Sequence, residues 1–204
     1  MRTGAGKSTY CHAMQQFLSL LKRKVVVVNL DPANETMLYS CDIDIRDLIQ
    51  IEDVMLHKKL GPNGAMLYCM EFLNKNIEWL ESKLQDHKES YILIDCPGQI
   101  ELYVHDQNMQ QIIDHLTNPS GLDCRLVCLN LVDSHHCTDI GKYISVLLTS
   151  LSSMLHIALP HINVLSKIDV IEKFGELAFG LEFYTDVLDL NYLVDHLQVI
   201  DVLL

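Results

Sequence analysis

Four short apolar segments, each ending in or directly followed by an acidic or hydroxyl residue, limit the folds open to this chain. They are residues 24–30, 91–95, 125–132 and 160–165. Runs of this length rich in Val, Ile and Leu are typical of strands buried on both faces, as in parallel sheets covered by helices. Helices are predicted before the first segment, over residues 7–21, and between the segments, over residues 65–84, 107–116 and 140–155. This alternation predicts an α/β fold whose ligands bind at the carboxyl ends of the strands.

Composition narrows the class of protein. The chain has 204 residues, enough for a large core, and we expect residues 1–204 to form a single domain. Fifteen basic against 27 acidic residues give a net charge of −12, which argues against direct nucleic-acid partners and anionic membranes. Seven Cys without a C-x-x-C pair favour free thiols in a reducing compartment. No apolar run approaches the ~18 residues of a transmembrane helix, so no membrane partner is expected.

The segment Gly4-Ala5-Gly6-Lys7-Ser8-Thr9 matches the second half of the phosphate-binding signature G-x-x-x-x-G-K-[ST]. In this signature backbone N–H groups surround phosphate oxygens, the Lys ammonium reaches the β- and γ-phosphates, and the hydroxyl binds Mg²⁺. Lys7 and Ser8 would have those two roles. The first Gly of the signature is replaced by Met1, and no strand precedes the loop. The alternative is therefore a glycine-rich turn, and the other motifs must decide.

The predicted strand at residues 91–95 leads into Asp95-Cys96-Pro97-Gly98, which matches the D-x-x-G pattern of nucleotide switches. In that pattern the Asp holds Mg²⁺, usually through water, and the Gly amide approaches the γ-phosphate as closely as only Gly allows. Gln99 follows at a position where a side chain could orient a water. The alternative is a strand followed by an ordinary Pro-Gly turn.

The predicted strand at residues 160–165 leads into Ser166-Lys167-Ile168-Asp169, which resembles the N/S/T-K-x-D element of GTP-binding proteins. The Asp169 carboxylate would accept hydrogen bonds from N1–H and the 2-amino group of guanine, and the stem of Lys167 would pack under the base. Adenine lacks that pair of donors, so buried polar groups left unpaired would penalise ATP.

Three further segments are ambiguous on their residues alone. Asp31 follows the strand at 24–30, where ligands bind in such sheets, or it caps the turn before Pro32. Residues 61–64 (Gly-Pro-Asn-Gly) indicate a tight turn and no more. Residues 133–139 contain Asp, His and Cys but lack a second ligand pair, so we predict a loop with a helix cap rather than a zinc site.

Together these motifs resemble the GPN-loop GTPase family. The resemblance is carried by V-N-L-D-P-A-N at 28–34, Gly61-Pro62-Asn63, D-C-P-G-Q-I-E-L at 95–102, L-V-D-S-H-H-C-T-D at 131–139 and L-P-H-I-N-V-L-S-K-I-D at 159–169. It extends from Gly4 to the region of His196. It implies a P-loop NTPase-type, three-layer α/β/α fold with a mainly parallel sheet, and a Mg²⁺-dependent GTPase that binds GTP.

The resemblance also implies roles for single residues. Asn63 would stabilise the departing phosphoryl group across a dimer, Asp31 would lie near Mg²⁺ and the attacking water, and Gln99 is a weaker candidate for positioning that water. Ser8 and Asp95 would hold the metal. The residues expected to bind the nucleotide are Gly4, Ala5, Gly6, Lys7, Ser8, Thr9, Gly98, Ser166, Lys167 and Asp169.

Partners and location follow from the resemblance alone. Family members act as dimers in the assembly and nuclear import of RNA polymerase II. The implied partners are GPN-loop GTPase paralogues, RNA polymerase II subunits and assembly chaperones, in a cytoplasmic protein that shuttles to the nucleus.

The chain also departs from the family pattern. The family's first strand, before Arg2, and the elements after residue 197 are missing, and residues 198–204 look unrelated. We therefore expect an incomplete domain whose GTP affinity is weak or absent. The alternatives are a nucleotide-free interaction subunit that pairs with a full-length paralogue, and an ATP-dependent P-loop protein.

Overall fold

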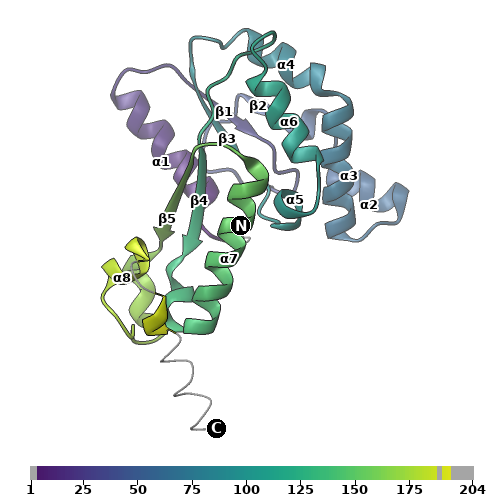
Figure 1. Ribbon diagram of the computed structural model, residues 1–204. Coiled ribbons are helices and arrows are strands. Elements are labelled where there is room, and N and C mark those ends of the chain that lie inside the picture. The colour runs from purple at the N-terminus through teal and green to yellow at the C-terminus, as the bar shows by residue number, and fades with distance from the viewer. Residues whose placement is uncertain (1–3, 188–189, 194–204) are drawn as a thin grey trace.

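The computed structural model describes residues 4–187 and 190–193 (Figure 1). Its strands are β1 (Val25–Asn29), β2 (Ile43–Asp44), β3 (Tyr91–Asp95), β4 (Cys128–Asp133) and β5 (His161–Ser166). Its α-helices are α1 (Lys7–Leu20), α2 (Ile51–Lys58), α3 (Pro62–Lys75), α4 (Ile77–Gln85), α5 (Glu101–Val104), α6 (Asn108–Thr117), α7 (Ile140–Ile157) and α8 (Leu181–Asp186). Three short 3-10 helices complete it: η1 (Ile45–Asp47), η2 (Ser134–Thr138) and η3 (Ile168–Lys173).

The strands form two parallel sheets. In the first, the order is β2-β1-β3, and the last residue of β1, Asn29, stands opposite Asp95. In the second, β4 pairs with β5, and Asp133 stands opposite Ser166. The four predicted strands are confirmed, although the third begins later than expected, at Cys128. In each sheet the register places the polar residues that end neighbouring strands side by side.

Helices cover both faces of the first sheet. Val26 and Val28 of β1 belong to the main core, together with buried residues of α2, α3, α4 and α6. Val27 points to the other face, where it packs with Cys11 of α1 and with Leu93 of β3. This alternation follows from the side-chain period of two in a strand. Figure 1 shows the result, with α1 on one side of the strands and α3, α4 and α6 on the other. The predicted three-layer α/β/α fold is confirmed.

A cavity of about 410 Å³ lies between the two sheets. Side chains of β3 and β4 line it along both strands, those of α6 cover it, and Lys7 reaches it at one end. Within residues 4–187 and 190–193, no strand pairs with the edge of β3 or β4 that faces this cavity. The cavity therefore separates β3 of the first sheet from β4 of the second.

Two predictions on the helical layer were wrong. Residues 65–84 are not one helix, because Asn76 (φ −116°, ψ 34°) separates α3 from α4, and its side-chain amide donates to the carbonyl of Phe72 (2.8 Å). Residues 61–64 are not an isolated tight turn but the start of α3. Gly61 caps that helix, and Pro62 takes its first position, where a missing N–H leaves no intrahelical bond unmade.

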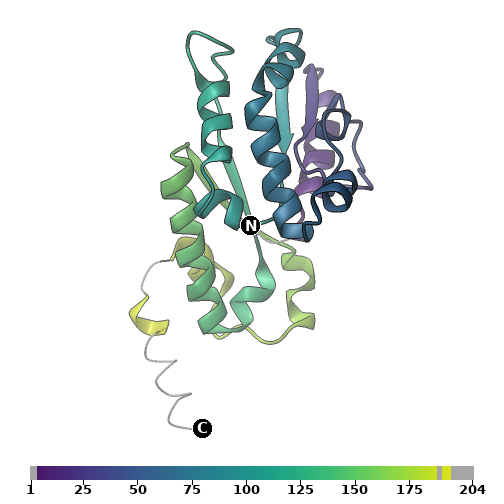
Figure 2. The same ribbon diagram turned by 90° about the vertical axis from the view of Figure 1, so that its right-hand side faces the viewer.

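Helix α7 packs against η2, α5 and α6, in the helical layer that Figure 2 shows from outside. Its buried residues are Ile140, Tyr143, Ser153 and Ile157. Among the described residues, α7 is the one helix whose length and composition would also suit a bilayer. Core helices of globular domains meet the same criterion, so this observation alone does not place α7 in a membrane.

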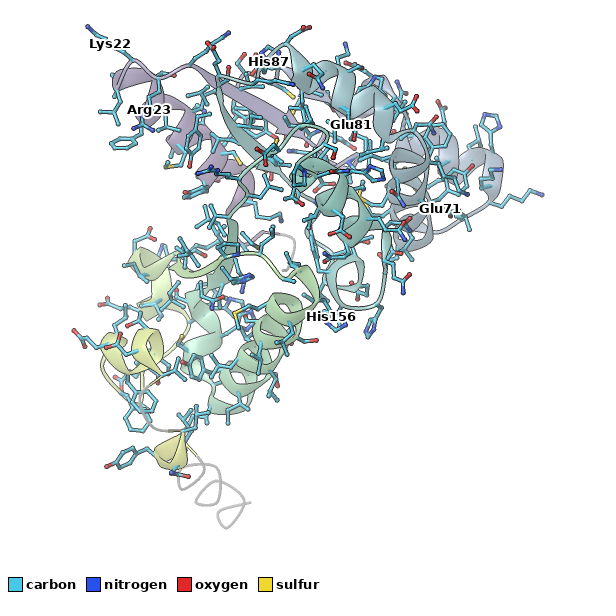
Figure 3. All side chains as sticks on the ribbon, turned by 45° about the horizontal axis from the view of Figure 1, so that its top comes forward. Lys22, Arg23, Glu71, Glu81, His87 and His156 are labelled. Carbon is cyan, nitrogen blue, oxygen red and sulfur yellow. The ribbon has the colours of Figure 1, made fainter. Side chains whose placement is uncertain are left out.

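The exposed basic residues and the free cysteine thiols agree with the interpretation of the composition. Lys22 and Arg23 follow α1 at the end opposite the glycine loop, and Figure 3 shows them extending from the outside of the molecule. All seven cysteines are free, as predicted.

In residues 133–139, Asp139 caps α7 by accepting a hydrogen bond from the Lys142 N–H (2.9 Å), which confirms the predicted helix cap.

Candidate functional site

The glycine loop leads directly into α1. Gly4 (φ 93°) and Gly6 (φ 96°) have left-handed backbone conformations that residues with a Cβ adopt only with strain. Gly6 precedes the first turn of α1, and no side chain caps that turn. Its free N–H groups and the positive end of the helix dipole are therefore available to an anion. Lys7 begins the helix, and no acidic group within the described residues forms an ion pair with it.

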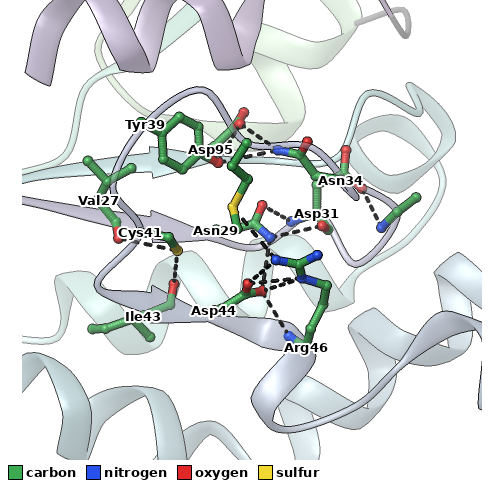
Figure 4. A network of polar contacts seen from close by, with 12 residues as sticks. Val27, Asn29, Asp31, Asn34, Tyr39, Cys41, Ile43, Asp44, Arg46 and Asp95 are labelled. Atoms are coloured by element: carbon green, nitrogen blue, oxygen red, sulfur yellow. Dashed lines mark hydrogen bonds and ion pairs between the residues drawn. The ribbon is translucent and has the colours of Figure 1, made fainter.

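The two carboxylate oxygens of Asp95, the last residue of β3, have different surroundings. Oδ2 accepts hydrogen bonds from the Tyr39 hydroxyl (2.8 Å) and from Nδ2 of Asn34 (3.2 Å) (Figure 4). Oδ1 is buried and has no hydrogen-bond partner in the part of the chain that the structure describes. The residue as a whole is only 1% exposed. Because a buried carboxylate oxygen without a partner is unfavourable, Oδ1 is suited to bind a cation or a water on a cation.

Ser8 of α1 lies at the same place. Nδ2 of Asn34 is 3.4 Å from the Ser8 hydroxyl oxygen and 3.2 Å from Oδ2 of Asp95. One amide thus links the two residues expected to hold Mg²⁺. The described residues contain no group of three or more His, Cys, Asp or Glu that could hold a metal alone. A hydroxyl with a single carboxylate fits Mg²⁺, which commonly completes its octahedral shell with phosphate oxygens and water.

Asp31 follows β1 and is half-buried. Its Oδ1 accepts a hydrogen bond from the Ala33 N–H (3.0 Å). Burial raises the pKa of Asp31; this hydrogen bond and the charge of Lys7 oppose the rise, and the charge of Asp95 adds to it. Asp31 therefore lies within electrostatic range of Lys7 and Asp95. It also forms the capping contact that was its alternative role.

A partly buried polar network supports the turn that contains Asp31 (Figure 4). Asn29 accepts a hydrogen bond from the Asp31 N–H (3.2 Å) and donates to the Asp31 carbonyl (3.1 Å) and to Oδ1 of Asp44 (3.0 Å). Arg46 forms an ion pair with Asp44 at 2.6 Å. Burial opposes ionisation of Asp44, but hydrogen bonds from Arg46 outweigh it and lower its pKa. The network fixes the backbone that presents Asp31.

The charge of Asp95 affects two neighbouring groups. Burial, followed by this charge, raises the pKa of Cys11 to about 12. The same two causes raise the pKa of Tyr39. Both groups are therefore neutral near pH 7, and the Tyr39 hydroxyl keeps the proton that it donates to Asp95.

A second polar group lies at the end of the other sheet. The Ser166 hydroxyl is within hydrogen-bond distance of the carbonyls of Ala5 (2.9 Å) and Val132 (3.1 Å). It thereby ties the end of β5 to the glycine loop. Asp169 lies on η3, is exposed, and forms no hydrogen bond or ion pair within residues 4–187 and 190–193. Its carboxylate is free to accept donors from a ligand.

Lys167 connects these residues to β4. It has a left-handed backbone (φ 58°), and the Ser134 hydroxyl donates to its carbonyl (2.9 Å). Its ammonium lies 2.6 Å from Oδ2 of Asp133. Burial opposes ionisation of Asp133, but hydrogen bonds from Lys167 and His135 lower its pKa to about 2. The contacts of Lys167 with Ser134 and Asp133 fix the turn between Ser166 and Asp169.

Asn63 and Gln99, which belong to separate sequence motifs, form a third polar group. Nε2 of Gln99 is 3.4 Å from Oδ1 of Asn63. Asn63 is exposed in the first turn of α3, and Gln99 directly follows the buried Gly98. The two amides can therefore act on one ligand.

The structure thus gathers the predicted residues into three groups, centred on Asp95, on Ser166 and on Asn63. Thr9 belongs to none of them, because its side chain is exposed on α1. Sequence reasoning did not single out Asn34 or Tyr39. Asn34 could have been identified from the sequence, because it belongs to the D-P-A-N motif. No sequence pattern marks Tyr39, because its partner Asp95 lies 56 residues away.

A protein-family model described as "conserved hypothetical ATP binding protein" matches residues 2–201. The chain is 58% identical over 195 residues to GPN-loop GTPase 2 of Danio rerio, covering 96% of this chain and 62% of that relative. It is 55% identical over 196 residues to GPN-loop GTPase QQT1 of Arabidopsis thaliana, covering 96% of this chain and 65% of that relative. For GPN-loop GTPase 2 of Saccharomyces cerevisiae, the identity is 43% over 198 residues, covering 96% of this chain and 56% of that relative.

Among solved structures, a GTPase from Pyrococcus abyssi in its apo form has a similar fold, with a TM-score of 0.71 and 24% sequence identity. The likeness covers 84% of this chain and 66% of that one. The chain spans between 56% and 65% of the length of the three curated relatives named above.

Proposed function

We propose that this chain binds GTP with Mg²⁺ and hydrolyses it, because it belongs to the family of that model and its own curated relatives are GPN-loop GTPases. The observation that carries this proposal is the buried Asp95, whose Oδ1 lacks a partner among the described residues while Oδ2 is held beside Ser8. A carboxylate in this state, next to a hydroxyl and a glycine loop, suits a magnesium–phosphate complex.

The triphosphate would lie against the start of α1. The N–H groups after Gly6 would donate to phosphate oxygens, and the unpaired Lys7 ammonium would neutralise the β- and γ-phosphates. Ser8 and Asp95 would hold Mg²⁺, which when bound neutralises charge on the phosphate oxygens. The buried Gly98 would bring its N–H close to the γ-phosphate.

Hydrolysis needs a positioned water and stabilised charge rather than a covalent nucleophile. Asp31 would accept a hydrogen bond from the attacking water, since its turn is fixed by Asn29 and burial raises its pKa. Gln99 would hold the same water. Asn63, which Gln99 contacts, would donate its amide protons to the departing phosphoryl group.

The base would lie against the second sheet. The free Asp169 carboxylate would accept the N1–H and 2-amino protons of guanine, and the stem of Lys167 would pack under the ring. An ATP-binding protein is the competing assignment, and the description of the matching family model favours it. Adenine would leave Asp169 without these donors, so we propose GTP.

On the family resemblance, we also propose a dimer with a GPN-loop GTPase paralogue. Its role would be assembly and nuclear import of RNA polymerase II with chaperones, in the cytoplasm and with shuttling to the nucleus. Asn63 is exposed, so its side chain is accessible to a partner subunit. Co-purification with each paralogue and with polymerase subunits tests this assignment.

A nucleotide-free interaction subunit is the second candidate, and the cavity between β3 and β4 favours it. A glycine loop without a paired strand behind it is less preorganised, and preorganisation contributes much of the affinity of such loops. In this case the chain would pair with a full-length paralogue and leave turnover to it.

Titration of fluorescent GTP and ATP, each with Mg²⁺ and with EDTA, tests the proposal. We expect GTP to bind more tightly than ATP, and Mg²⁺ to strengthen binding to the wild-type chain but not to Asp95→Asn. Asp114→Asn, on the exposed face of α6, is the matched control. A folded wild-type chain that binds neither nucleotide would contradict the proposal and support the second candidate.

A further inference from the structure

Asp95 is held by a segment that lies outside the strands of its sheet. Residues 30–42 connect β1 to β2, and they bring Asn34 and Tyr39 to the end of β3 (Figure 4). We propose that Tyr39 and Asn34 are positioning residues that fix Oδ2 of Asp95 and so direct Oδ1 towards Mg²⁺. This inference rests on the proposed function, because it assumes that Asp95 contributes to metal binding.

The Tyr39 ring is anchored in the core. It is 6% exposed and packs with Cys11 of α1, Val27 of β1 and Leu93 of β3. Three elements therefore fix the ring, and only its hydroxyl reaches Asp95. A hydroxyl held this way limits the rotation of the carboxylate about its last bond.

The hydrogen bonds have a defined direction. Oδ2 of Asp95 can only accept, so the Tyr39 hydroxyl donates to it at 2.8 Å. Nδ2 of Asn34 can only donate, and it lies 3.3 Å from the Tyr39 oxygen and 3.2 Å from Oδ2. The chain of donors thus runs from Asn34 through Tyr39 to Asp95. Every donor acts on Oδ2 and none acts on Oδ1 in the described part of the chain.

Asn34 extends the arrangement to the second metal-binding candidate. Its amide nitrogen is 3.4 Å from the Ser8 hydroxyl oxygen. One loop therefore sets the spacing between Ser8 on α1 and Asp95 on β3. In metal sites, loss of such a supporting hydrogen bond typically reduces metal affinity by about 10–100-fold.

Tyr39→Phe tests the inference, because it removes one oxygen and keeps the packed ring. We expect the Mg²⁺ concentration for half-maximal binding to the GTP-loaded chain to rise by about 10–100-fold. GTP affinity in EDTA should stay unchanged. The readout is direct titration of the GTP-loaded chain with the divalent metal, in which Mn²⁺ replaces Mg²⁺ and electron paramagnetic resonance measures the free Mn²⁺, so that no turnover is needed. Asn34→Ala should shift the same midpoint upwards.

Tyr143→Phe is the matched control. Tyr143 is also buried, and its hydroxyl donates to the Tyr184 carbonyl at 2.7 Å in a different cluster. It should lower thermal stability without changing the Mg²⁺ midpoint. If Tyr39→Phe behaves like this control, the positioning role is wrong while the GTPase proposal stands. If the wild-type chain shows no Mg²⁺-dependent GTP binding, the proposed function fails, and the positioning role fails with it.

Discussion

The Ser166 hydroxyl lies 2.9 Å from the carbonyl oxygen of Ala5, so the end of β5 is hydrogen-bonded to the glycine loop across 161 residues of sequence. The two motifs expected to hold opposite ends of the nucleotide are therefore in direct contact.

Ser166→Ala should weaken GTP binding by about fivefold, because a typical intramolecular hydrogen bond contributes about 1 kcal/mol. Ser145→Ala is the control, since Ser145 makes a similar bond to the Gly141 carbonyl (2.8 Å) on the exposed face of α7. Titration of fluorescent GTP measures both. Equal affinity for the two variants would mean that the contact with Ala5 does not organise the glycine loop.

Asp169→Asn should reduce the preference for GTP over ATP. The carboxylate is exposed and unpaired among the described residues, so the substitution removes an acceptor for the donors of the ligand rather than a structural contact. We expect the ratio of the two dissociation constants to fall by about 10–100-fold. Glu172→Gln, on the exposed surface of the same short helix η3, should leave the ratio unchanged. An unchanged ratio in Asp169→Asn would favour an ATP-binding protein.

Asn63→Ala and Gln99→Ala should each lower kcat by about 100-fold with little change in KM, because small errors in water position are costly in phosphoryl transfer. Since Gln99 contacts Asn63, the double variant should lose less than the sum of the two single effects. Asn74→Ala, which removes contacts with Asn108 and Gln111 farther along α3, is the control. Full additivity would show that the two amides act independently.

The ion pair between Asp133 and Lys167 predicts a dependence of stability on pH. The pKa of Asp133 in the fold is about 2, below its ordinary value of 3.8. Its carboxylate therefore stabilises the fold above the ordinary pKa, and this contribution disappears as the pH falls through about 2.

Asp133→Asn should accordingly lower the free energy of unfolding at pH 7 by about 1–2 kcal/mol, allowing for screening at the partly exposed Lys167. The difference from wild type should shrink below pH 4 (about the ordinary pKa of Asp). Urea unfolding at several pH values measures this, with the exposed Asp47→Asn as control. A difference that stays constant down to pH 2 would contradict the role of ionisation.

The strands could be predicted from local sequence because β-branched runs that end in Asp or Ser combine two signals, burial and a ligand edge. The helical layer was harder to predict. In residues 65–84 the apolar spacing continues through Asn76, and only the backbone shows the break. In α7 the apolar residues surround the helix, so their pattern could not select Tyr143 and Ile157 as buried while leaving Leu148 exposed.

The residues of the candidate site likewise include some that the sequence indicates and some that it does not. Lys7, Asp95 and Asp169 lie in motifs whose spacing reflects direct contact with a ligand, so the sequence alone indicates them. Tyr39 acts on Asp95 through the fold, and no local pattern marks a contact of this kind. The pairing of Asn63 with Gln99 depends on where α3 begins relative to β3, which is a property of packing.

The separation of β3 from β4 has a mechanical consequence. A ligand that touches Ser8 beside the first sheet and Asp169 beyond the second would bridge two sheets that share no strand pairing in the described part of the chain. It would link the two sheets for as long as it stays bound. We expect the bound ligand to stiffen the molecule across the boundary between the two sheets, and cleavage of its terminal group to weaken this link.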